Sequence, residues 1–194
     1  MLTTDDALVV VDVQVDFLPG GSLPVPRGDQ VLPVLRRYVD AFHQAGLAVV
    51  ATRDWHPPDH CSFVQQGGPW PPHCVAGSAG ARFATALELP ANALIVSKAT
   101  ERERDAYSAF EGTELDQRLR QAKVKRVFVG GLATDYCVLH TVRDALQRGF
   151  QTVLLQDAIR AVDVKAGDGE RAVAQMLRLG AVPMTVEQLG GHQR

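Results

Sequence analysis

Gly130-Gly131-Leu132-Ala133-Thr134-Asp135-Tyr136-Cys137 follows an apolar run at 124–129 and precedes apolar residues at helical spacing that end at Gly149. This pattern predicts a β-strand that passes through a glycine turn into an α-helix. Thr134 or Asp135 is the expected N-cap, so Cys137 should lie in the first helical turn. The free N–H groups and the helix dipole would favour a thiolate there and can bind an oxyanion. The alternative is a cysteine packed under the helix as a small hydrophobic residue.

Strand-like and helical segments alternate along the rest of the chain. Short apolar runs predict strands at 7–12, 47–52, 93–97, 124–129, 152–156 and 182–186. Helical spacing predicts helices at 31–45, 81–89, 113–122, 138–148 and 169–179. The alternation predicts an α/β fold with a doubly wound, mostly parallel six-stranded sheet and helices on both faces. Because no linker or internal repeat interrupts it, residues 1–194 are expected to form a single domain.

The composition argues against several classes of partner. The 194 residues carry 20 basic and 22 acidic side chains, a formal net charge of −2, so no basic surface for nucleic acid or anionic lipid is expected. No apolar run approaches the roughly 20 residues that span a bilayer, and the first residues lack the basic start of a signal peptide. Three cysteines do not suggest a disulfide framework. We therefore expect a cytoplasmic protein without membrane or nucleic-acid partners, and homo-oligomerisation is left open.

Four chemically active side chains lie at or just beyond the ends of predicted strands. They are Asp12, Asp54, Lys98 and Cys137. Parallel strands would bring all four to one edge of the sheet, where ligands bind in open α/β folds. Since a free cysteine has a pKa near ~8.5, Cys137 needs activation, which Asp12 and Lys98 could supply together. Taken singly, each has a plain explanation as a turn residue or a surface charge.

A second cluster is expected in the long polar loop after the second strand. Asp54 and His56 point the same way if the backbone is extended, and the prolines before His73 hold another imidazole in a stiff frame. Two imidazoles and a carboxylate suit zinc, iron or manganese. His60 and Ser62 are candidates for a further ligand. The alternative is that these histidines are merely exposed.

The sequence resembles the isochorismatase-like cysteine hydrolases, and among them the nicotinamidases and pyrazinamidases. The resemblance covers essentially the whole chain. Its motifs are Val11 to Phe17, Asp54-Trp55-His56, Trp70 to Cys74, Lys98, Tyr107 to Phe110, and Gly131 to Val138. The order Asp, Lys, Cys marks the superfamily, and the metal-binding residue types indicate the nicotinamidase branch.

The resemblance implies roles for the residues at the sheet edge. Cys137 would be the nucleophile, Asp12 the general base and then acid, and Lys98 the charge partner of both. The N–H groups of Ala133 and Cys137 would stabilise the oxyanion, and the peptide before Ala133 would be cis.

The resemblance also implies one divalent metal ion, with zinc favoured over iron or manganese. Asp54, His56 and His73 would bind it. The fourth position falls to His60 or Ser62, and His60 is favoured because imidazole binds such metals better than a neutral hydroxyl.

The implied substrate is nicotinamide, held between Phe17 and Trp70 and hydrolysed to nicotinate and ammonia through a thioester on Cys137. Pyrazinamide is expected as a second substrate. The alternatives are a related amidase for another small amide, or a zinc-binding protein without catalysis.

Overall fold

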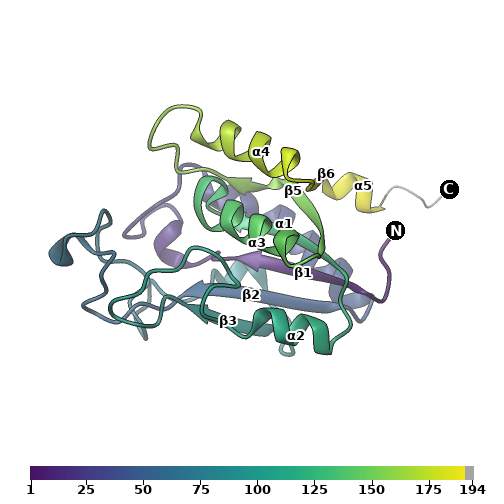
Figure 1. The fold of residues 1–194 in the computed structure, drawn as a ribbon, viewed down its shortest axis with the longest axis horizontal. Coiled ribbons are helices and arrows are strands. Elements are labelled where there is room, and N and C mark those ends of the chain that lie inside the picture. The colour runs from purple at the N-terminus through teal and green to yellow at the C-terminus, as the bar shows by residue number, and fades with distance from the viewer. Residues whose placement is uncertain (191–194) are drawn as a thin grey trace.

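Six parallel strands form one sheet in the order β3-β2-β1-β4-β5-β6 in the computed structural model, which describes residues 1–190 (Figure 1). The strands are β1 (Asp6–Val11), β2 (Ala48–Asp54), β3 (Leu94–Lys98), β4 (Arg126–Leu132), β5 (Gln151–Arg160) and β6 (Val182–Met184). The helices are α1 (Val31–Gln44), α2 (Leu115–Gln121), α3 (Leu139–Gln147), α4 (Asp168–Arg178) and α5 (Val186–Gly190). The predicted doubly wound sheet is confirmed, and every strand pair in it is parallel.

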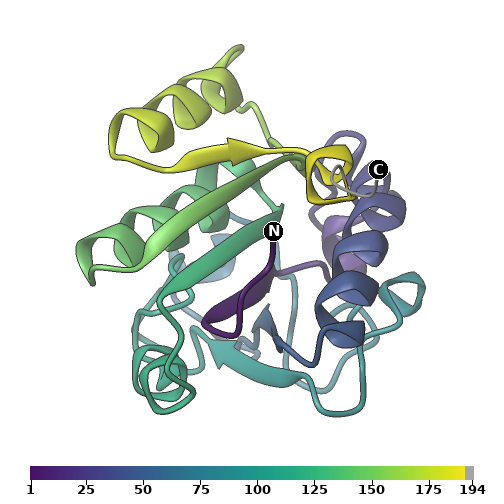
Figure 2. The same cartoon turned by 90° about the vertical axis from the view of Figure 1, so that its right-hand side faces the viewer.

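Helices cover both faces of this sheet. Figure 2 shows α1 and α5 on one side and α2, α3 and α4 on the other. Residues 7–11 of the central strand β1 are all apolar because both faces of the strand are covered: Leu8 and Val10 pack into the core under α1, whereas Val9 and Val11 pack into the opposite core. A strand buried on both faces favours a run of apolar residues, and the one polar side chain of β1, Asp6 at its start, pairs with Arg126. Within residues 1–190, no helix combines the length and the apolar character that crossing a membrane requires.

Several predicted elements differ from the structure. Strand β4 runs through the two glycines to Leu132 instead of turning at them, and β5 continues to Arg160 instead of ending at 156. The expected helix at 81–89 is extended chain followed by one 3₁₀ turn, Thr85–Leu87, because its backbone pairs with the segment after β1 instead of with itself. The N–H of Val15 donates to Arg82 O, and the N–H of Ala84 donates to Val13 O. The last strand ends at Met184 instead of continuing to 186. The short helix α5, which was not predicted, begins at Val186.

The turn that carries Cys137 also differs in detail. Cys137 lies in one turn of π-helix, Thr134–Val138, that precedes α3, and no side chain caps this turn. The predicted N-cap at Thr134 or Asp135 is therefore wrong. The carboxylate of Asp135 instead accepts hydrogen bonds from the N–H groups of Val162 and Asp163, each at 2.9 Å. This contact ties the turn to the chain that follows β5.

Candidate active site and metal-binding cluster

Lys98 lies at the centre of the side chains that meet at the edge of the sheet. Its Nζ is 3.0 Å from Asp12 Oδ2 and 3.5 Å from Cys137 Sγ, and it donates to Asp54 Oδ1 and to the Ala106 carbonyl. All four side chains are buried. The reason for their meeting is topological, since β1, β2, β3 and β4 are parallel neighbours and each ends beside one of these residues.

The two oxygens of the Asp12 carboxylate have different surroundings. Oδ1 accepts a 2.6 Å hydrogen bond from the hydroxyl of Thr52, a fully buried residue of β2. Oδ2 is buried beside the Lys98 ammonium and, within the described chain, accepts no hydrogen bond. A carboxylate oxygen with free lone pairs is thus available next to the thiol.

Burial is the largest influence on the pKa of the Cys137 thiol. It raises the pKa of the Cys137 thiol well above its ordinary value, and the nearby Lys98 ammonium offsets this only in part. This burial opposes the expected stabilisation of a thiolate by the helix dipole, because desolvation disfavours the anion. Burial alone would lower the pKa of Lys98, but Asp12 and Asp54 raise it well above its ordinary value. The lysine stays charged.

Asp54, His56 and His73 bring one ligand atom each to within 4.8 Å of one another. The Nδ1 atoms of both imidazoles lie against backbone carbonyls, 3.2 Å from Ala99 O for His56 and 2.8 Å from Pro71 O for His73. If both Nδ1 atoms carry the hydrogen, each Nε2 keeps a lone pair for a metal, the usual arrangement around histidine ligands. Burial lowers the pKa of His56 to about 4, so its ring is neutral near pH 7. These donors fit a divalent ion such as zinc.

His60 and Ser62 are not directed at this cluster. His60 Nδ1 is 2.7 Å from Ser62 Oγ, and His60 Nε2 is 3.1 Å from the Arg104 carbonyl, so both ring nitrogens have partners. The His60 ring stacks on His56 at 4.2 Å between centroids. His60 therefore packs against the metal cluster, and Ser62 holds its ring.

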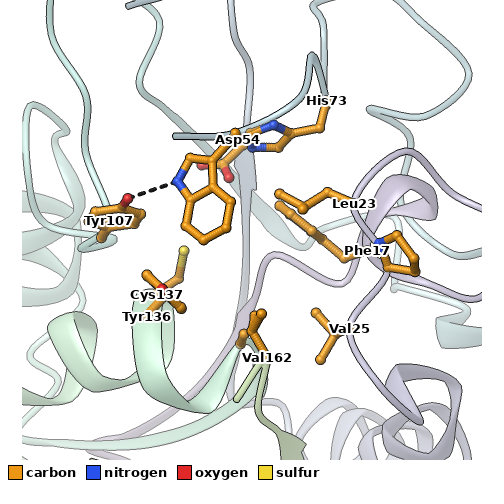
Figure 3. Close-up of a pocket in the computed structure, with 12 residues that line it drawn as sticks. Phe17, Leu23, Val25, Asp54, His73, Tyr107, Tyr136, Cys137 and Val162 are labelled. Carbon is orange, nitrogen blue, oxygen red and sulfur yellow. Dashed lines mark hydrogen bonds between the residues drawn. The ribbon is translucent and has the colours of Figure 1, made fainter. Parts of the chain in front are cut away.

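A cavity opens directly onto Cys137 and the metal donors (Figure 3). Its empty volume, including the open mouth, is about 440 Å³. It is lined by Phe17, Leu23, Pro24, Val25, Asp54, Trp70, His73, Tyr107, Ala133, Tyr136, Cys137 and Val162. The Trp70 indole donates a 3.0 Å hydrogen bond to Tyr107 Oη, the dashed line in Figure 3. Its lining is mostly apolar and aromatic, which suits a small aromatic ligand.

The isochorismatase domain family matches residues 6–188. The chain belongs to the isochorismatase family. A nicotinamidase of Escherichia coli is 38% identical, over 93% of this chain and 94% of that protein. A structure of a Pyrococcus horikoshii pyrazinamidase in complex with zinc is 49% identical, with a TM-score of 0.90 over 93% of this chain and 99% of its own. A structure of PnC1 from L. infantum in complex with nicotinate is 38% identical, with a TM-score of 0.85 over 95% and 94% of the two chains.

Several residues of the isochorismatase-family site escaped the sequence analysis. Tyr136 and Tyr107 were given no role, yet both line the cavity, and Tyr136 packs edge-on against Trp70 at 5.1 Å. Gln14 was quoted only as part of a motif, but its amide bonds to both the N–H and the C=O of Asp54, each at 2.8 Å. The sequence carried no simple signal for this contact, because the chain turns between Asp12, whose φ is +48°, and Gln14, whose N–H donates to the Asp12 carbonyl. The peptide between Leu132 and Ala133 is cis, as the resemblance implied.

Proposed function

We propose that this chain is a metal-dependent cysteine amidohydrolase that converts nicotinamide to nicotinate and ammonia, and that also hydrolyses pyrazinamide. One observation carries the proposal: the Cys137 thiol and two donors of the metal cluster, Asp54 and His73, line the same small cavity. A ligand in this cavity can reach a nucleophile and a metal together. The names of the relatives, nicotinamidase and pyrazinamidase, support the same substrate class.

The first step is attack by the thiol. Asp12 Oδ2 takes the proton of Cys137 while Sγ forms a bond to the carboxamide carbon. The N–H groups of Ala133 and Cys137 donate to the oxyanion, and both residues border the cavity. The Lys98 ammonium, 3.5 Å from Sγ, compensates the negative charge that moves from carboxylate to sulfur and back.

The remaining steps return every group to its starting state. The C–N bond breaks as protonated Asp12 gives its proton to the leaving nitrogen, which departs as ammonia and leaves a thioester on Cys137. Asp12 then takes one proton from an attacking water and the C–S bond breaks, and the product acid gives its remaining proton to ammonia and leaves as nicotinate. The proton returns to the sulfur, so the net reaction consumes one water.

Asp54, His56 and His73 would hold one divalent ion, with zinc favoured over iron or manganese. When bound, it supplies a Lewis acid for the ring nitrogen of the substrate and so orients the carboxamide toward Cys137. Phe17, whose ring centroid is 5.6 Å from that of His73, and Trp70 flank the ring. To serve as a fourth ligand, His60 would have to release either Ser62 or the Arg104 carbonyl.

We also propose a cytoplasmic location and leave the number of subunits to measurement. The three cysteines, Cys61, Cys74 and Cys137, are all free thiols, which suits a reducing compartment.

Ammonia release by the purified protein tests this proposal. Nicotinamide is compared with benzamide, which has the same ring size and amide but no ring nitrogen, before and after chelation and again after zinc is restored. We expect zinc-dependent turnover of nicotinamide and little turnover of benzamide. Release that survives full metal removal would contradict the metal's role. A folded, zinc-loaded protein that leaves nicotinamide intact would favour another small amide as the substrate.

A further inference from the structure

The structure contains a second set of metal-ligand atoms beside the first. Asp12, Asp54 and Cys137 each bring one ligand atom to within 4.8 Å of the others, and all three side chains are buried. Asp54 belongs to both sets. In this set Asp12 Oδ2 is buried and, within the described residues, accepts no hydrogen bond, although the Lys98 ammonium lies 3.0 Å away. Figure 3 shows the Cys137 sulfur on the side of the cavity that faces Asp54.

An ammonium group already occupies the middle of this second set. Lys98 Nζ is 3.0 Å from Asp12 Oδ2 and 3.5 Å from Cys137 Sγ, and it pairs directly with Asp54. Every atom of the donor set therefore contacts the same nitrogen. Lys98 is almost completely buried, so no other group can take the place of its ammonium unless the surrounding side chains move. A metal ion and the ammonium cannot both occupy this position.

We propose that Lys98 is a built-in cation that keeps divalent metal off the nucleophile, and that Asp12, Asp54 and Cys137 form a latent second metal site. Two carboxylates and a thiolate would select thiophilic ions such as Zn²⁺ or Cd²⁺. Binding would form a metal–sulfur bond and release the thiol proton to solvent. The bound ion would block the thiol, so an enzyme that needs metal in the adjacent cluster gains from excluding it here.

Replacing Lys98 by a neutral side chain should open the latent site. Without the ammonium, the two buried carboxylates would lack a counter-charge, which is costly unless they bind a proton or another cation. Lys98→Met keeps the length and much of the volume of the side chain. The Lys98→Met protein should therefore bind a second ion that the unaltered protein excludes.

Cadmium titration of metal-free protein measures this directly. Bound ions per chain are counted by elemental analysis after desalting, and the thiolate-to-cadmium charge-transfer band in the ultraviolet reports sulfur ligation. We expect one ion and no band from Cys137 in the unaltered protein, and two ions with the band in Lys98→Met. The double variant Lys98→Met, Cys137→Ser is the matched control, because it should lose the band and the second ion while Cys61 and Cys74 remain.

The proposal is overturned if folded Lys98→Met binds only one ion, or if its second ion persists in the double variant. Should Lys98→Met fail to fold, the unaltered protein decides. Its Cys137 should be alkylated by iodoacetamide equally fast with and without excess Cd²⁺, and protection by Cd²⁺ would overturn the proposal. None of these measurements uses amide hydrolysis, so their failure is distinct from failure of the proposed function.

Discussion

At the scale of single residues, the proposed base Asp12 depends on how its carboxylate is turned. The Thr52 hydroxyl holds Oδ1 at 2.6 Å, which leaves Oδ2 facing Lys98 and the thiol. A hydrogen bond to a charged group contributes about 1.5–3 kcal/mol. Thr52→Val removes that bond with little change in volume and should lower kcat by about ten- to a hundredfold. Steady-state ammonia release measures it.

The matched control for this prediction is Thr52→Ser, which keeps the hydroxyl and should retain most of the kcat. A Thr52→Val enzyme with unchanged kcat would show that the orientation of Asp12 does not limit the reaction.

His56 is the residue on which the proposed metal site depends most. It is 2% exposed, its Nδ1 contacts a backbone carbonyl, and its ring is neutral near pH 7. Loss of an outer partner of a metal ligand already costs about 10- to 100-fold in affinity, so His56→Ala should lower zinc affinity by at least about 100-fold. Competition with a chromophoric chelator measures this. The exposed His43 of α1 supplies the control, His43→Ala, which should bind zinc normally.

At the scale of elements, Gly131 allows β4 to lie directly against β1. Its φ is +130°, and a Cβ there would come 2.1 Å from the Val11 carbonyl oxygen. Gly131→Ala should therefore lower the free energy of unfolding by at least about 2 kcal/mol, as measured by urea denaturation. In Gly149→Ala the φ is also positive, but no atom lies within 4 Å, so its loss should be smaller. Equal losses would contradict the steric explanation.

Asp135 connects the nucleophile turn to the far wall of the cavity. Its carboxylate binds the N–H groups of Val162 and Asp163, and Val162 lines the cavity. Asp135→Ala should loosen that wall and raise the KM for nicotinamide several-fold with a smaller change in kcat. Asp168→Ala, in the first turn of α4, removes a nearby carboxylate that does not line the cavity and should leave KM unchanged. A pure kcat effect in Asp135→Ala would argue against this role.

How far the sequence could predict an element depended on where its backbone hydrogen bonds go. The strand before Cys137 and the helix after it were predictable because their apolar spacing is regular. The segment at 81–89 has helical spacing too, yet it pairs with the residues after β1, a contact that local pattern does not encode. Aspartate is also a common N-cap residue, but the carboxylate of Asp135 binds the N–H groups of Val162 and Asp163, which lie 27 and 28 residues away in the sequence.

At the scale of the whole molecule, strand order explains why the chemistry was easier to predict than the pocket. Parallel neighbours necessarily bring Asp12, Asp54 and Lys98 to one edge, so the cluster followed from strand ends alone. The cavity walls come from loops, among them Leu23 to Val25 and Val162, whose positions depend on long-range contacts. The protonation of Cys137 could not be predicted either, because it depends on how completely the fold buries the thiol.

The most direct test of the central claim is ammonia release from nicotinamide by Cys137→Ala, with zinc content and fold verified against the unaltered protein. The proposed mechanism predicts normal zinc binding and a fall in turnover of at least about a thousandfold, since a covalent catalyst without its nucleophile keeps only residual activity. Turnover near that of the unaltered protein would contradict the account, because hydrolysis would then proceed without the thioester on Cys137.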